Sequence, residues 1–176
     1  KPDDPDSRPE DSGWTQFTKS PDTRLVYVSL TGDDKHDGLS PERPVKTAQK
    51  GYSLIRHGHP DWLLFRRGDV FHGGLTWAKS GSSAAEPMLV GAYGDPNQPR
   101  PKFATDGKGM LRLAGGVTVR HVAFTDLHAY ANQRDPDSPD FAGGRTDEWG
   151  IKWWGKAEDV LFEGLLIEFF SHNMCV

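Results

Sequence analysis

The sequence predicts an all-β protein built as a β-solenoid, in which short parallel strands stack in successive coils. Three observations favour this fold class. Among the 176 residues, 20 Gly and 13 Pro are set between short apolar runs, which is typical of turn-rich β architecture. Only one segment has apolar residues at helical spacing. Finally, two segments of the chain share one pattern of apolar residues, which is the signature of a repeat architecture.

Composition limits the number of domains and the classes of partner. A hydrophobic content of 35% in 176 residues supports one core. The formal net charge of -4 argues against nucleic acid as a partner, because neutralising phosphates needs clustered Lys and Arg. No apolar run has the length of a membrane span, so we expect no membrane partner. The single cysteine, Cys175, excludes an internal disulfide framework.

The N-terminal third is divided into a leader and a capping unit. We expect residues 1–22 to form an extended leader, since the first part combines Pro, Asp and Ser without apolar residues. Residues 23–60 are predicted to hold a strand at Leu25–Leu30, an Asp/Gly turn segment and a short helix at Val45–Arg56. The apolar side of this helix is expected to cover the open end of the first coil, and it consists of Val45, Ala48, Tyr52 and Ile55.

Residues 61–176 are predicted to form the first coils of the solenoid. Here Gly109–Leu127 matches Gly150–Phe170 in pattern, with one insertion between the copies. The alignment pairs Met110 with Ile151, Leu113 with Trp154, Val117 with Val160, Val119 with Phe162, Val122 with Leu165 and Phe124 with Ile167. It predicts that Val117, Val119, Val160 and Phe162 point inward and lie directly above one another. Because the chain ends inside an apolar repeat, we expect it to be truncated.

A resemblance to a known family rests on the order of several motifs across residues 25–176. They are YVSLTGDDKHDGLSPERPVKTAQKGYSLIRHG, then LLFRRGDVFHGGLTW, SGSSAAEPMLVGAYGD and RPKF. In this order the motifs resemble the opening of the right-handed parallel β-helix proteins of the pectin-lyase-like superfamily, which includes secreted relatives of alginate and chondroitin-B lyases. The resemblance implies a helical N-terminal cap.

The resemblance also implies a function for the complete protein. We expect an extracellular or periplasmic enzyme that acts on an acidic polysaccharide, more in the manner of a lyase than of a glycoside hydrolase. The alternative is a non-catalytic β-helix that serves as an adhesin, a structural element or a glycan-binding module. The family commonly uses calcium, so calcium is the cofactor that the resemblance implies. It supplies no catalytic residue here, because such residues are expected on coils after Val176, in a segment that would complete the protein.

The polar insertion between the repeat copies predicts where a glycan would bind. Residues 128–149 form a connection far longer than usual, and such insertions in solenoids often build binding sites. Two histidines, His128 and His172, are candidates for proton transfer, because the repeat alignment places His172 near Ala129 on the neighbouring coil. The candidate substrate-binding residues combine polar groups and aromatic planes, as sugar sites do, and they are Tyr130, Arg134, Asp147, Trp149, Trp153 and Asn173. A solvated loop beside core tryptophans explains the same residues.

Three aspartates in the loop GDDKHDG are weak candidates for a calcium site. Asp33, Asp34 and Asp37 lie close together, and carboxylate oxygens are ligands that calcium prefers. The loop lacks the spacing and the final Glu of an EF-hand, and Asp–Gly turn chemistry explains it more simply. Turn chemistry is therefore the simpler explanation of this loop, with a calcium site as the alternative.

Overall fold

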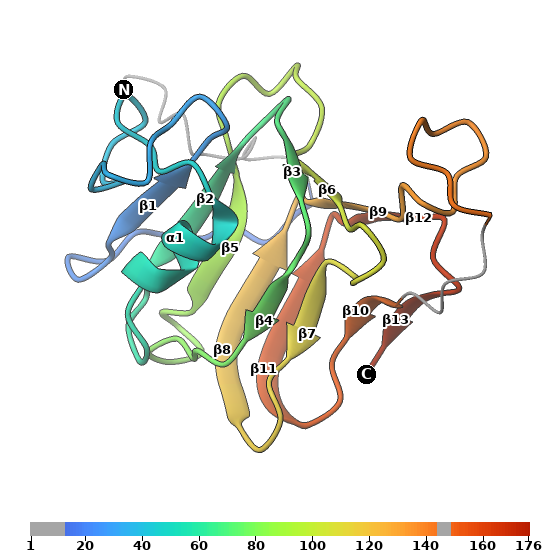
Figure 1. Ribbon diagram of the computed structural model, residues 1–176. Helices are drawn as coiled ribbons and strands as arrows, with labels where there is room; N and C mark the ends of the chain where they lie inside the picture. The colour runs from blue at the N-terminus through green and yellow to red at the C-terminus, as the bar shows by residue number, and fades with distance from the viewer. Residues whose placement is uncertain (1–12, 144–148) are drawn as a thin grey trace.

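The chain folds into three sheets of parallel strands and one helix. The computed structural model describes residues 13–143 and 149–176. Every pair of neighbouring strands in these ranges is parallel, and one short helix lies beside the first strands (Figure 1). The first strand lies at one end of the stack and the last strand at the other.

The chain visits the three sheets in the same order four times. Sheet A contains β1 (Leu25–Val28), β2 (Trp62–Arg66), β5 (Met88–Tyr93), β8 (Thr118–Thr125) and β11 (Lys156–Glu163). Sheet B contains β3 (Val70–His72), β6 (Lys102–Ala104), β9 (His128–Tyr130) and β12 (Leu166–Glu168). Sheet C contains β4 (Leu75–Trp77), β7 (Leu111–Leu113), β10 (Trp149–Lys152) and β13 (His172–Cys175). We call each passage through sheets A, B and C a circuit; the first runs from β2 to β4 and the fourth from β11 to β13. This order is compatible with a parallel β-helix.

The helix is shorter than the sequence predicted. Helix α1 spans Ala48–Leu54, whereas the apolar spacing predicted Val45–Arg56. Val45 instead forms a parallel bridge with Val28 of β1, and the helix ends because Ile55 has an extended backbone. The apolar residues Val45 and Ile55 are thus buried in extended segments on either side of the helix. Helical spacing of apolar residues alone cannot distinguish such segments from a further helical turn.

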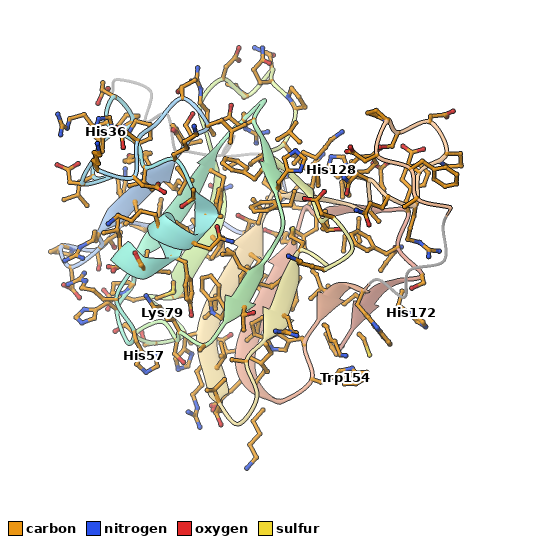
Figure 2. All side chains as sticks on the ribbon, viewed as in Figure 1. His36, His57, Lys79, His128, Trp154 and His172 are labelled. Atoms are coloured by element: carbon orange, nitrogen blue, oxygen red, sulfur yellow. The ribbon has the colours of Figure 1, made fainter. Side chains whose placement is uncertain are left out.

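The position of the helix agrees with the predicted cap. Ala48 and Ile55 are buried in the main core at the β1 end of the stack. The Lys79 ammonium donates to the carbonyl oxygens of Tyr52 and Ile55, at 2.7 and 2.6 Å, and so provides partners for carbonyls that a helix end leaves unsatisfied (Figure 2).

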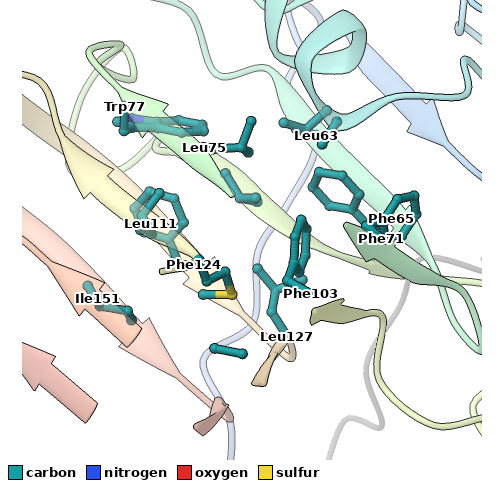
Figure 3. Close-up of a cluster of buried hydrophobic side chains, with 14 of the residues drawn as sticks. Leu63, Phe65, Phe71, Leu75, Trp77, Phe103, Leu111, Phe124, Leu127 and Ile151 are labelled. Atoms are coloured by element: carbon teal, nitrogen blue, oxygen red, sulfur yellow. The ribbon is translucent and has the colours of Figure 1, made fainter. Parts of the chain in front are cut away.

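Aromatic residues from all three sheets meet in the main core (Figure 3). Phe65 of sheet A meets Phe103 of sheet B edge to face, with ring centroids 5.0 Å apart. Trp77 of sheet C meets Phe124 of sheet A in the same way at 4.9 Å. These contacts cross the space between sheets, so each circuit buries its inward side chains against both other sheets.

The strand register differs from the predicted repeat alignment. Val122 lies beside Val160, the position that the prediction gave to Val117, and Phe124 lies beside Phe162. On sheet C, Leu111 and not its neighbour at position 110 lies beside Ile151. The predicted vertical stack of inward residues is therefore wrong in register, although stacking itself is confirmed.

Left-handed residues at two places in each copy explain why the alignment failed. His121 in β8 and Asp159 in β11 have φ angles of 55° and 53° and occupy the same register position. Asp126 and Gly164 have φ angles of 60° and 63° and occupy the same position in the turn from sheet A to sheet B. The predicted alignment matched the break at His121 in the first copy with the turn at Gly164 in the second, because both interrupt the alternation of apolar residues.

The described part of the predicted leader packs against the outer face of sheet A. That face carries a second apolar cluster, and Phe17 packs against it. Farther along the segment, the Thr15 hydroxyl donates to the Glu163 carboxylate at 3.0 Å, and the ring of Trp14 lies beside Gly164. Residues 13–22 therefore cross the sheet from its first strand to its last.

Candidate functional site

The outward face of sheet C carries two cationic side chains at matching strand positions. Arg112 on β7 lies beside Lys152 on β10, and the next neighbours in the row are Thr76 on β4 and Cys175 on β13. Neighbouring strands are about 4.8 Å apart, so side chains at matching positions form a row across the strands. A ligand that lies along this row would meet one circuit after another.

A depression with a volume of about 380 Å³ opens at the β4 and β7 end of this row. Its lining comes from these strands and from the turns before them: Gly74, Leu75, Thr76, Gly107, Lys108, Gly109 and Arg112. Gly109 is needed for the close approach of the next circuit, because a Cβ atom there would lie 2.1 Å from the carbonyl oxygen of Trp149. The glycines leave backbone groups open to a ligand and leave Lys108 and Arg112 as the charged groups of the lining.

Aromatic rings lie at the other end of the row. The Lys152 ammonium lies 4.2 Å from the ring centroid of Trp154 and 5.5 Å from that of Trp149. The imidazole of His172 stacks on Trp149, with centroids 4.1 Å apart and an interplanar angle of 12°. Trp154 is 55% exposed and lies at the surface near His172 (Figure 2). Exposed aromatic planes beside cations can pack against the apolar face of a sugar ring.

The charges of this row are not neutralised within the described chain. Neither Arg112 nor Lys152 forms an ion pair with a carboxylate in residues 13–143 or 149–176. Four arginines of the described chain do have such partners, namely Arg56, Arg67, Arg100 and Arg120. The face of sheet C is thus locally positive on a chain whose formal net charge is -4. An anionic ligand would gain charge-assisted hydrogen bonds here without breaking existing ones in these ranges.

His128 and Tyr130 belong to a separate polar cluster on sheet B. His128 Nε2 lies 2.7 Å from Oε2 of Glu168, so the contact joins β9 to β12. The Tyr130 hydroxyl donates to Asp135 at 2.5 Å, and the Lys102 ammonium lies 4.6 Å from the Tyr130 ring centroid. These contacts tie two circuits and the start of the insertion together.

The electrostatics of this cluster suit a structural role. The pKa of His128 is lowered, mainly by burial; the hydrogen bond to the Glu168 carboxylate raises it, and the Lys102 charge lowers it. Burial and the hydrogen bond to Asp135 raise the pKa of the Tyr130 hydroxyl. His128 is only 7% exposed, so a polysaccharide has little access to its imidazole.

The structure does not bring the two candidate histidines together. His128 lies beside Leu166 on sheet B, and His172 lies beside Trp149 on sheet C. Figure 2 shows them well separated on the fold. The expected position of His172 near Ala129 followed from the incorrect register, and it is wrong.

The other predicted site residues are divided between the two regions. Arg134 lies with the sheet B cluster, where its Nε donates to the carbonyl oxygen of Phe169 at 2.7 Å. Trp153 is buried in the core, so the aromatic wall at the surface consists of Trp149 and Trp154. Asn173 is exposed on β13 next to His172. Asp147 lies outside the described residues.

Sequence reasoning missed Arg112, Lys152 and Trp154. A single cation within a strand carries no signal by itself, but the correct register aligns Leu111–Leu113 (LRL) with Ile151–Trp153 (IKW). Both segments place a cation between two buried apolar residues. This shared pattern was the available signal, and a shift of one residue in the alignment hid it, because such a shift exchanges the two faces of a strand.

The three aspartates of the N-terminal loop serve as turn and cap acceptors. Asp34 accepts hydrogen bonds from the amides of Lys46 and Thr47 and from the Thr47 hydroxyl. Asp33 and Asp37 each accept a bond from a backbone amide two residues later. Within residues 13–143 and 149–176, no group of three or more His, Cys, Asp or Glu side chains is arranged to hold a metal ion. The loop therefore does not fit calcium.

Two comparisons of the sequence with known proteins found no match. No protein-family model matches the chain, and no curated protein matches it. In the part of the chain that the structure describes, no helix has the length and apolar character needed to cross a membrane.

Proposed function

We propose that this chain is part of a secreted, right-handed parallel β-helix protein that binds an acidic polysaccharide across the strands of sheet C. The observation that carries the proposal is the row of Arg112 and Lys152 at matching positions of successive circuits, flanked by a glycine-lined depression and by exposed indole rings. The order of the sheets and the capping helix support the β-helix assignment, from which the extracellular or periplasmic location follows as part of the same proposal.

The chemistry of the row favours a glycan that carries carboxylates. The planar guanidinium of Arg112 can engage both oxygens of a uronate carboxylate, and the Lys152 ammonium supplies a second positive charge one strand away. Trp149 and Trp154 offer planes for the C–H faces of a pyranose ring. A neutral sugar would use the rings but leave both charges without a partner.

We propose polysaccharide lyase chemistry as the activity of the complete protein. In such a reaction a base takes the proton next to the uronate carboxyl, a carbon–carbon double bond forms, and the glycosidic C–O bond breaks with its electrons leaving on oxygen. A cation beside the carboxylate stabilises the charge that develops. Arg112 and Lys152 suit this second task, and His172, stacked on Trp149, is the described imidazole on the same face. No step is assigned to calcium, because the described carboxylates do not form a site for it.

The rival function is recognition without turnover, as in an adhesin or a glycan-binding module. It is favoured by one observation: among the described residues, His172 is the one imidazole beside the row, and no carboxylate lies against Arg112 or Lys152 to orient a base. Both functions require acidic glycan binding on sheet C, and they differ in whether an unsaturated product forms.

The test measures binding and product formation on the same samples. Uronate oligosaccharides should bind more tightly than neutral ones, and R112A or K152A should each weaken binding by about 1–3 kcal/mol with little change in melting temperature. R43A is the matched control, because Arg43 is an exposed arginine of the N-terminal loop. Ultraviolet absorbance of an unsaturated uronate product separates the lyase from the binding module. Equal affinity of the parent for neutral and acidic oligosaccharides would contradict the proposal.

A further inference from the structure

Asn132 has a buried side-chain amide at the start of the insertion, and this amide forms hydrogen bonds with two separate segments of the chain. It is 1% exposed and is the second residue after β9. Its Nδ2 donates to Oδ1 of Asp106 at 2.7 Å and to Oδ2 of Asp140 at 2.9 Å, while its Oδ1 accepts from the amide of Asp106 at 3.0 Å. One side chain therefore joins the turn before β7 to the insertion segment, which we define as residues 131–143.

The turn that Asn132 holds contributes to the lining of the depression on sheet C. Asp106 directly precedes Gly107, Lys108 and Gly109, all three of which line the depression. Asp106, Gly107 and Gly109 have φ angles of 50°, 82° and 76°. An aspartate in the left-handed region is strained, and such a conformation persists when surrounding bonds fix it. The bonds from Asn132 to both the amide and the carboxylate of Asp106 provide that fixation.

The same Asn132 amide also holds the insertion segment, through Asp140. Asp140 is an exposed residue whose carboxylate accepts from Asn132, and the amide of Ala142 donates to the carbonyl of Gln133 at 2.9 Å, so the segment folds back on its own start. The hydrogen bond from the Tyr130 hydroxyl on β9 to Asp135 fixes the start of the same segment. Displacement of Asn132 would thus change both the insertion segment and the turn that lines the depression.

We propose that Asn132 is the positioning residue for glycan binding on sheet C: it fixes the left-handed turn at Asp106 that shapes the depression and holds the insertion segment beside it. This inference rests on the proposed function, since it assigns a residue to that same site. Asn132 does not contact the ligand. Its amide is required because it donates to two carboxylates at once, which a carboxylate of the same shape cannot do.

The test uses N132D in the full chain, with N97D as the matched control. N132D keeps the shape and the oxygen that accepts from the Asp106 amide, but it removes both donated bonds and places a third carboxylate beside Asp106 and Asp140. Asn97 also donates to an aspartate, Asp95, at 3.1 Å, but on the exposed loop between β5 and β6. Calorimetry with a uronate oligosaccharide gives the affinity, and hydrogen exchange reports on residues 106–109 and 131–143.

At pH 7.5, N132D should lose about tenfold or more in affinity. It should regain part of that affinity, relative to the parent at each pH, as the pH is lowered toward 5, because the introduced carboxyl can donate again once it is protonated. Exchange should accelerate at 106–109 and 131–143 but not in β2 and β5. N97D should show none of these changes. A general loss of stability would also accelerate exchange in β2 and β5, which separates it from the loss of the turn.

A second variant keeps the inference testable if N132D does not fold. D140A removes one exposed carboxylate and one bond, so it should speed exchange in residues 131–143 and weaken binding less than N132D. Parent-like affinity in both variants would overturn the role of Asn132 and leave the proposed function intact. If the parent binds no acidic glycan, the proposed function fails, and unchanged exchange at 106–109 in N132D would separately overturn the positioning of the turn.

Discussion

At the scale of single residues, buried polar side chains join successive circuits of this protein. Asp61 is fully buried and accepts bonds from the backbone amides of Arg24 and Arg56 and from the Arg56 guanidinium. His128 joins β9 to β12 through Glu168. Buried polar groups are tolerated when their bonds are satisfied, and each of these also links segments that are distant in sequence. Of these groups, His128 has a pKa that burial lowers, so it is a position where pH acts on stability.

His128 should make the protein less stable at acidic pH. Burial, the main cause, holds its folded-state pKa below the ordinary value of 6.5. As the pH falls through that ordinary value, the unfolded chain takes up a proton that the folded chain does not, so the free energy of unfolding decreases until the pH reaches the folded-state pKa. Urea unfolding between pH 7.5 and 5 should show this decrease in the parent and a smaller one in H128Q, which can still donate to Glu168. An equal decrease in both proteins would show that other groups are responsible.

At the scale of elements, the helix lies close to the sheet because of one glycine. A Cβ atom on Gly51 would lie 2.5 Å from Cγ2 of Val28 and 2.9 Å from Cδ1 of Leu63, both in the main core. Glycine within a helix costs about 1 kcal/mol relative to alanine, so its presence here indicates a packing requirement that outweighs helix propensity. The short helix can then cover the end of the stack without displacing core side chains.

G51A should therefore destabilise the protein in spite of its higher helix propensity. Overpacking a filled core costs about 1–3 kcal/mol, which exceeds the gain of about 1 kcal/mol expected from replacing glycine in a helix. G115A is the control, because a Cβ atom on Gly115 would meet nothing within 4 Å and no left-handed backbone is involved. Thermal unfolding should show a loss for G51A and a neutral or slightly stabilising effect for G115A. A stabilised G51A would mean that the helix can move away from the sheet.

The sequence was sufficient to predict the kinds of element but not their register. Apolar runs and turn residues predicted parallel strands and one helix, although several short strands were not predicted and the helix is shorter than expected. The left-handed residue His121 within β8 and the turn at Gly164 interrupt the apolar alternation in the same way, so no rule based on alternation could tell them apart. The candidate site was not predicted because the predicted register was wrong. The pairing of Arg112 with Lys152 depends on a one-residue shift. The hydrogen bonds of Asn132 depend on contacts between circuits, which no local pattern encodes.

At the scale of the whole molecule, residues 13–22 act as a strap over the outer face of sheet A. Each circuit pairs its strands with those of the neighbouring circuits, so one end of the stack can open without the other. The strap adds contacts that are not between neighbours: Phe17 packs on the cluster that contains Trp62 and Leu89, and Thr15 binds Glu163 on the last strand of the sheet. It therefore couples the fourth circuit to the first.

Removal of the strap should loosen the fourth circuit first. A chain lacking residues 1–17 would be compared with one lacking residues 1–12, so that the difference isolates residues 13–17. The loss of the half-buried Phe17 side chain and of the Trp14 contact with Gly164 should lower the free energy of unfolding by about 1–3 kcal/mol. Hydrogen exchange should become faster in β11 and β12 than in β2 and α1, because local opening concentrates where contacts are fewest. A uniform acceleration would mean that the circuits unfold as one unit, and no difference between the two shortened chains would mean that the strap contributes nothing to this coupling.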